Sequence, residues 1–266
     1  MIDERTAGAP QGRIQSAERA LRILRAFTEA GQQASVAEIG RQLGVHKSTA
    51  SRLVATLVAA GFLERAGATD HVGLGPELVR LGRLAMSSRS LPDVAAPEMD
   101  ALAAAVGETV TLSVADTGET LTIAQSAGTH AVGLQSWLGR RSPLHATSDG
   151  KVLLAFGAAR LPGGPLEART PDTIVDRGVL AVELERARDR GWASAEGDFE
   201  LGLNGVAAPI RTADGTCRAV LCVSGPAYRI RAADLPALGD QCASAAARIA
   251  ARLDLQPSGV VAGTAT

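Results

Sequence analysis

Two short segments near the N-terminus, joined by a glycine, constrain the fold more than any other feature of the chain. In SVAEIGRQLGV, Ser35 and Glu38 have the S-x-x-E spacing of a capping box, which predicts a helix that runs to about Leu43. Gly44 follows at the expected end of this helix, because glycine reaches positive φ at little steric cost. A second helix is expected to begin near Lys47. Two helices joined by so tight a turn are typical of a helix-turn-helix.

The segments on either side extend this pair into a winged helix-turn-helix. Upstream, apolar residues recur at helical spacing through SAERALRILRAFTEAG, and Gly31 ends the predicted helix. Downstream, FLER and HVGL are expected to form two short strands around the turn AGATD. We therefore predict a winged helix-turn-helix DNA-binding domain over residues 14–75, preceded by a disordered arm at 1–13.

The helix that begins at Lys47 is expected to have one apolar and one polar face. Ala50, Leu53 and Leu57 share a face and should pack against the preceding helix. The polar side chains that remain outside are Lys47, Ser48, Thr49, Ser51, Arg52 and Thr56. Such an array suits a recognition helix, whose N-terminal end enters the major groove and meets phosphates and base edges. An ordinary solvated helix face is the alternative, but the capped helix, the glycine turn and the wing together favour DNA binding.

The wing of this domain contributes little charge. Arg65 is the basic residue of its stem, and Asp70 lies at its tip, so we expect the wing to act by backbone proximity more than by charge. The net charge of the chain is −1. Residues 1–80 hold ten basic and eight acidic side chains (net +2), and residues 81–266 hold seventeen and twenty (net −3). This mild asymmetry is weak support for an N-terminal part that faces DNA.

The second half of the chain alternates strands with segregated helices. ETVTLSVAD, ETLTIAQSA, AVGLQSW, GVAAPIRT and CRAVLCVSG are expected to be antiparallel strands. Helices are expected in PDVAAPEMDALAAAVG, DGKVLLAFGAA and VLAVELERARDRG, and over about 232–253. This order indicates the α+β class. We predict linker helices over 76–106, a second domain over 107–255, and a disordered tail over 256–266.

Motifs of enzymes and metal sites are missing from the sequence. Neither G-x-S-x-G nor HExxH occurs, and DGKVLL differs from a P-loop because His145 and Val152 stand where glycine and Ser or Thr are required. Cys217, Cys222 and Cys242 lack metal-ligand spacing and are expected to be buried free thiols. We therefore expect no enzyme, no cofactor and no metal.

The expected compartment is the cytoplasm. No run of 18 or more apolar residues occurs, which argues against a membrane span. The segment MIDERTAGAPQGR lacks the apolar stretch of a secretion signal. We expect no membrane partner.

These segments resemble the IclR family of bacterial regulators over about residues 14–254. IQSAERALRILRAF is similar to the family's first helix, and SVAEIGRQLGVHKSTASRLVATLVAAGFLER to its helix-turn-helix. LGPELVRLG is similar to the entry into its linker helix, and LHATSDGKVLLAF to its central signature. GWASAEGDFELGLNGVAAPI and VSGPAYRI resemble its late block. The resemblance implies a GAF-like effector-binding domain, a homodimer or a dimer of dimers, palindromic operators, and control by small metabolites that are often organic acids.

The resemblance also implies a lining for the effector pocket. The residues that align with it are Ala131, Leu134, Ser148, Asp149, Leu203, Gly205, Cys222 and Ser224.

This sequence departs from the family at three of the pocket positions. A polar or thiol side chain is common where Gly205 stands, and an acidic contact is expected near Ala195. Asp149 replaces a residue that is usually small. Capping of the following helix is an alternative role for Ser148 and Asp149. An ionised Asp149 in the cavity would favour an effector that is neutral, cationic or bound through a water. Trp137 is expected to be a satisfied surface or interface ring.

The sequence leaves two functions open. The first is a dimeric, effector-controlled DNA switch that binds double-stranded operator DNA. The second is a dimeric module that senses metabolites or binds partners without specific DNA binding, and the weakly basic wing is its only support.

Overall fold

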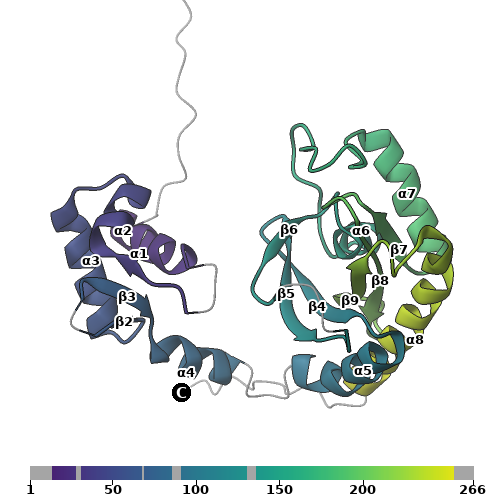
Figure 1. Cartoon of the computed structure of the whole chain (residues 1–266), viewed down its shortest axis with the longest axis horizontal. Coiled ribbons are helices and arrows are strands. Elements are labelled where there is room, and N and C mark those ends of the chain that lie inside the picture. Colours follow the sequence, from purple (N-terminus) through teal and green to yellow (C-terminus); the bar gives the residue numbers. More distant parts are fainter. Residues whose placement is uncertain (1–13, 28–30, 68, 86–90, 131–135, 255–266) are drawn as a thin grey trace, which may run out of the picture. The chain divides into compact units, whose positions relative to one another are not determined.

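The computed structural model of the chain describes residues 14–27, 31–67, 69–85, 91–130 and 136–254. The chain forms two compact units, Met1–Ser88 and Arg89–Thr266 (Figure 1). The first unit includes the helix Pro76–Ala85, and the second includes the helix Leu91–Val106. The predicted borders at residues 75 and 106 are finer than this division and stay predictions.

The first unit packs helices against a small antiparallel sheet. The order of its strands in space is β1-β3-β2. Its buried core joins α1, α2, α3 and the two wing strands through Ile23, Ile39, Val54, Leu63 and Val72. Its elements are α1 (Gln15–Arg25), β1 (Ala34–Ser35), α2 (Val36–Leu43), α3 (Lys47–Ala59), β2 (Leu63–Arg65), β3 (His71–Leu74) and α4 (Pro76–Ala85). The predicted wing is confirmed, and β1 adds a third strand that was not predicted.

A capping box fixes the start of α2, as predicted. The N–H of Glu38 donates to Ser35 Oγ at 3.3 Å, and the N–H of Ser35 donates to Glu38 Oε2 at 2.8 Å. Hydrogen bonds from the backbone and then the side chain of Ser35 lower the pKa of Glu38. Gly44 ends the helix with φ +64°, and His46 Nδ1 accepts the N–H of Ser48 at the start of α3. The helix-turn-helix therefore follows from local capping and one left-handed glycine.

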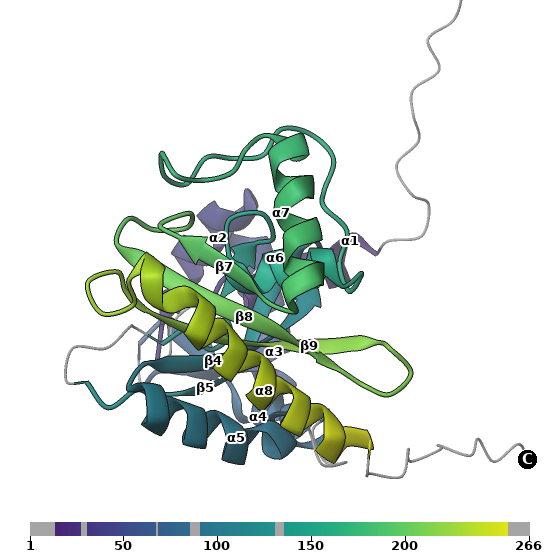
Figure 2. The same ribbon diagram turned by 90° about the vertical axis from the view of Figure 1, so that its right-hand side faces the viewer.

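The second unit is a six-stranded antiparallel sheet with helices on both faces. The order of its strands is β6-β5-β4-β9-β8-β7. Figure 2 shows α5 and α8 side by side along one face, and these helices share the larger apolar core with the central strands. Its elements are α5 (Leu91–Val106), β4 (Thr109–Asp116), β5 (Glu119–Ser126), β6 (Arg141–Pro143), α6 (Ser148–Ala155), α7 (Arg177–Arg190), β7 (Ala193–Glu196), β8 (Leu203–Arg211), β9 (Cys217–Pro226) and α8 (Leu235–Asp254).

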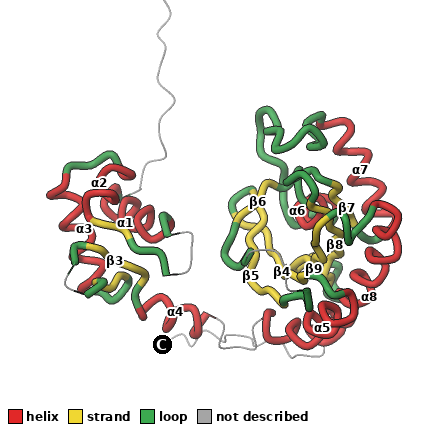
Figure 3. Tube along the Cα trace, in the orientation of Figure 1, coloured by secondary structure: helices red, strands yellow, loops and turns green. Residues whose placement is uncertain are grey.

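The sheet curls around α6 on its other face. In Figure 3 the strands form a curved layer. The helix α6 packs against β4, β5, β7, β8 and β9. The α+β class predicted from the sequence is confirmed. Most of the predicted strand AVGLQSW, residues 131–135, lies outside the described residues, and residues 136–137 are not in a strand. Among the described strands, β6 is the edge strand on that side.

Loss of the cap should weaken the first unit. Replacing Ser35 with Ala removes the acceptor of the Glu38 N–H, and we expect the free energy of unfolding to fall by about 1 kcal/mol. Denaturant unfolding of the whole chain, followed by circular dichroism, measures this change. Ser51→Ala on the exposed surface of α3 is the control and should change the value by less than about 0.5 kcal/mol. Equal effects of the two variants would contradict the capping role.

Candidate functional site

The outer face of α3 carries the side chains predicted to contact DNA. Ala50, Val54 and Leu57 are buried against the core, and this apolar stripe leaves the opposite face in solvent. Lys47, Ser48, Ser51, Arg52 and Thr56 are exposed, Thr49 is half-buried, and Arg65 is exposed on β2. The polar surface that the sequence predicts is therefore accessible, and its contact with DNA stays a prediction.

The charges of this face are free to meet an anion. Within the described residues, neither Lys47 nor Arg52 forms an ion pair with an acid. Arg41 and Lys47 line a shallow hollow at the turn between α2 and α3. Arg41 was not predicted, because it belongs to the first helix of the motif and the sequence analysis considered only the second. His46, the N-cap of α3, is exposed beside them.

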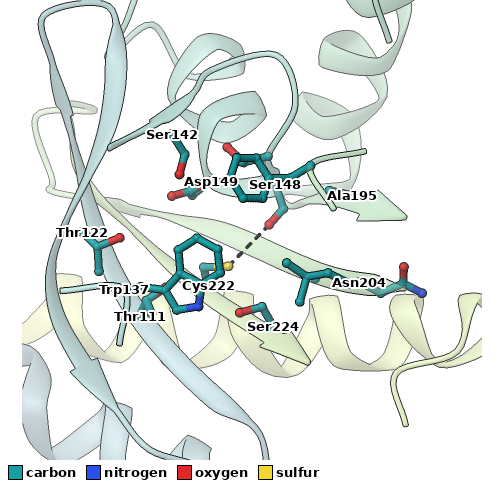
Figure 4. Close-up of a pocket in the computed structure, with 14 residues that line it drawn as sticks. Thr111, Thr122, Trp137, Ser142, Ser148, Asp149, Ala195, Asn204, Cys222 and Ser224 are labelled. Atoms are coloured by element: carbon teal, nitrogen blue, oxygen red, sulfur yellow. Dashed lines mark hydrogen bonds between the residues drawn. The ribbon is translucent and has the colours of Figure 1, made fainter. Parts of the chain in front are cut away.

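A cavity lies inside the second unit, between the curved sheet and the start of α6 (Figure 4). Its volume is about 60 Å³, on a scale on which one water needs about 10–15 Å³. The cavity therefore has room for a small molecule. The residues that line it are Thr111, Thr122, Trp137, Ser142, Thr147, Ser148, Asp149, Ala195, Phe199, Leu203, Asn204, Gly205, Cys222 and Ser224.

Six of the eight residues predicted for an effector pocket line this one cavity. They are Ser148, Asp149, Leu203, Gly205, Cys222 and Ser224. The other two, Ala131 and Leu134, lie outside the described residues. Ala195, where an acidic contact was expected, also lines the cavity and offers no charge. The structure thus brings these six side chains together, and their role as ligand contacts stays a prediction.

The start of α6 lies in close backbone contact with the turn that leads into it from β6. A Cβ on Gly150 would stand 2.5 Å from the Cα of Leu144, so only glycine fits there. Thr147 caps the helix, since its Oγ1 accepts the N–H of Gly150 at 3.2 Å. Ser148 instead contacts Cys222 Sγ at 3.4 Å, the dashed line in Figure 4. Capping as the main role of Ser148 is therefore wrong, and Asp149 only adds an acceptor for the same Gly150 N–H.

A buried ion pair ties α6 to the segment that follows β7. Lys151 Nζ donates to Asp198 Oδ2 at 2.7 Å and to the carbonyl of Ser194 at 2.9 Å. The side chains of Lys151 and Asp198 are only 3% and 7% exposed. Asp198 Oδ1 also accepts the N–H of Glu196 at 2.7 Å. Since Asp149 lies two residues before Lys151 and Phe199 directly follows Asp198, the pair holds two parts of the lining together.

Two aromatic rings close one side of the cavity. Trp137 and Phe199 meet edge to face, with ring centroids 5.7 Å apart. Trp137 was predicted to be a satisfied surface or interface ring; instead it lines the cavity, and its buried Nε1 has no hydrogen-bond partner among the described residues. Its segment was predicted to be a strand, but residues 136–137 are not in one, so the strand pattern did not give the direction of the ring. Thr111, Thr122 and Asn204 were also missed, because the face they take depends on strand register.

The three cysteines are buried free thiols, as predicted. Burial raises the pKa of Cys217 to about 11. Burial, and then the charge of Asp149, raise the pKa of Cys222 to about 12. The thiol of Cys222 is therefore protonated at neutral pH and lines the cavity as a small polarisable group.

The described ranges hold neither a metal cluster nor a membrane-spanning helix. Within them, no three His, Cys, Asp or Glu side chains gather as a metal site would require. No helix in the described part of the chain is long and apolar enough to cross a membrane.

Comparison with known proteins assigns both units to one family. Residues 16–67 match the model of the IclR helix-turn-helix domain, and residues 83–251 match that of the bacterial transcriptional regulator IclR C-terminal region. The chain belongs to the IclR family. It is a DNA-binding transcription regulator, and the prediction that it is not an enzyme is confirmed by this membership.

IclR-family relatives match the chain over most of its length. The HTH-type transcriptional repressor AllR of Salmonella typhi is 32% identical, over 97% of this chain and 99% of that protein. The HTH-type transcriptional regulator XynR of Escherichia coli is 32% identical, over 86% of this chain and 92% of that protein. A crystal structure of an IclR homolog from Microbacterium hydrocarbonoxydans, complexed with 4-hydroxybenzoate, is similar at 30% identity and a TM-score of 0.77. It covers 90% of this chain and 99% of that one.

Breaking the buried ion pair should destabilise the cavity unit. Lys151→Met leaves Asp198 buried without its cation, and we expect the free energy of unfolding of this unit to fall by about 3–5 kcal/mol. Denaturant unfolding measures the change. The double variant Lys151→Met with Asp198→Asn removes both charges and keeps an acceptor for the Glu196 N–H, so it should recover much of the loss. A single variant as stable as the wild type would contradict the role of the pair.

Proposed function

We propose that this regulator reads operator DNA with the outer face of α3, and that a small molecule bound in the cavity of the second unit controls this reading. The observation that carries the proposal is a polar, partly aromatic cavity within a chain whose other unit presents an exposed recognition helix. The proposed DNA contacts are Lys47, Ser48, Thr49, Ser51, Arg52 and Arg65. The proposed effector contacts are Ser148, Asp149, Leu203, Gly205, Cys222 and Ser224, with Ala131 and Leu134 from the family resemblance.

A small organic metabolite is the proposed effector. The homolog complexed with 4-hydroxybenzoate supports this, since it shares the fold over nearly the whole chain. The cavity has room for a small molecule. The effector can change operator binding only by differing in affinity for two arrangements of the protein. We place the regulator in the cytoplasm, together with its DNA.

A homodimer is the proposed assembly on DNA. A two-fold dimer matches a palindromic operator, whose half-sites lie about 10–10.5 bp apart or a multiple of that distance. On α4, the side chains of Val79 and Leu81 are 59% and 39% exposed. The more exposed of the two, Val79, lies on a helix that follows the wing and supports a contact between two copies there. A dimer of dimers would need a second surface, for which the exposed Val179 and Val182 on α7 are candidates.

A charge on α4 should therefore weaken the dimer. We expect Val79→Glu to shift the dissociation constant of the dimer upward by about tenfold or more, because it would bury an unpaired carboxylate. Sedimentation equilibrium of the whole chain measures this constant. Leu201→Glu, at an exposed position of the second unit, is the matched control and should leave it unchanged. Unchanged association of Val79→Glu would move the interface away from α4.

A second candidate is a metabolite-sensing module without specific DNA binding. The weakly charged wing favours it, since Arg65 is balanced by the exposed Asp70 at the tip. A gel shift with DNA from upstream of the gene separates the two candidates. Retention of this DNA over a random duplex supports the regulator, and equal affinity for both supports the second candidate.

Arg52 gives the sharper test of the DNA surface. Arg52→Ala should weaken binding to the selected duplex, and it should reduce the slope of log K against log salt by about 1 if Arg52 contacts a phosphate. Fluorescence anisotropy at several salt concentrations measures both quantities. Arg160→Ala, at an exposed position of the second unit, is the control. Unchanged affinity and slope for Arg52→Ala would remove this residue from the interface.

A further inference from the structure

A buried acid dominates the charge of the cavity. Asp149 is 8% exposed, and its Oδ1 accepts the N–H of Gly150 at 3.0 Å. The other carboxylate oxygen has no hydrogen-bond partner among the described residues. A carboxylate can accept several hydrogen bonds, so Asp149 retains capacity for a donor from a ligand.

Positive side chains do not line the cavity in the described part of the chain. The sequence of residues 131–135, Ala-Val-Gly-Leu-Gln, contains no charged residue either. Three cations that contact lining residues or their neighbours already have partners. Lys151 is paired with Asp198, while Arg140 and Arg169 stack on the rings of Trp137 and Phe199, at 5.5 and 5.3 Å from the ring centroids. The acid of the cavity is therefore not balanced by a base in its lining.

This charge distribution acts against an anionic ligand. A ligand carboxylate would bring a second negative charge beside Asp149, inside a space that has little water to screen it. A neutral or cationic ligand avoids this repulsion and can donate to the unpaired oxygen of Asp149.

The indole of Trp137 gives a second requirement for the ligand. Its Nε1 is buried and has no hydrogen-bond partner among the described residues. Indole N–H is a donor only, and buried donors are rarely left unpaired, so a ligand with an acceptor would satisfy it. Figure 4 shows Trp137 and Asp149 on the lining of the same cavity. The cavity thus lacks a hydrogen-bond donor at Asp149 and an acceptor at Trp137.

We infer that the effector of this regulator is a small molecule without net negative charge, which donates a hydrogen bond to Asp149 and accepts one from Trp137. This inference rests on the proposed function, because it concerns the ligand of the same cavity. An effector without negative charge distinguishes this regulator from regulators that bind organic acids. Carboxamides carry both a donor and an acceptor, and each has a carboxylate of almost the same shape, so the charge can be tested alone.

The test compares size-matched amides and acids on the whole chain. The panel pairs acetamide with acetate, propionamide with propionate, and 4-hydroxybenzamide with 4-hydroxybenzoate, and adds small amines and sugars. Thermal shift selects binders by mass action, and calorimetry gives their Kd values. We expect the tightest binders to be neutral or cationic, with an amide bound at least about tenfold more tightly than its acid. An acid that binds as tightly as its amide, or more tightly, overturns the inference.

Two variants separate the two contacts. In Asp149→Asn the repulsion is lost, so the preference for amide over acid should fall toward 1, while Asp189→Asn on the exposed surface of α7 should keep it. In Trp137→Phe the donor is lost, so the Kd of the amide should rise about 3- to 10-fold with the preference over the acid unchanged. A preference that survives Asp149→Asn would overturn the role of this acid.

The same data distinguish failure of the inference from failure of the proposed function. If acids are preferred and also change operator binding, the cavity is an effector site and only the inference about its charge is wrong. If no compound of the panel binds, the proposed effector site fails, and the inference fails with it.

Discussion

The close approach of the start of α6 to the turn that follows β6 is the constraint on which the cavity of the second unit depends. Gly150 lets the helix start against the backbone of Leu144, where any larger residue would overlap it. The buried pair of Asp198 and Lys151, the residue after Gly150, then ties α6 to the segment that follows β7. Together these contacts hold Asp149 inside the cavity, at a position where its charge is not balanced by a base in the described lining. The shape and the charge of the cavity therefore have one structural origin.

The two units depend on different kinds of contact. In the first, local capping by Ser35 and the left-handed turn at Gly44 set the angle at which α3 leaves the core, so that its polar face stays in solvent. In the second, contacts between residues distant in sequence build an enclosed polar space. Regulation requires that occupancy of this space and occupancy of DNA influence each other, and by linkage the influence is equal in both directions.

Sequence reasoning reached the features that depend on local chemistry or on linked motifs. The capping box, the glycine turn and the wing are local, and six of the pocket residues belong to motifs of the family. It failed where tertiary contacts decide. Trp137 lies at the end of a segment predicted as a strand but is not in one, and the direction of Thr111 depends on pairing with Cys222 across β4 and β9. Lys151 and Asp198 are 47 positions apart. The motif around each residue does not indicate the other as its partner.

The central claim is that the cavity and the recognition helix are coupled. The most direct measurement is calorimetric titration of the tightest compound of the matched panel into the regulator alone and into the regulator bound to its operator duplex. The coupling predicts two different Kd values, whose ratio equals the ratio of operator affinities measured with and without the compound. Identical Kd values in the two titrations, for a compound that binds in the cavity, would contradict it.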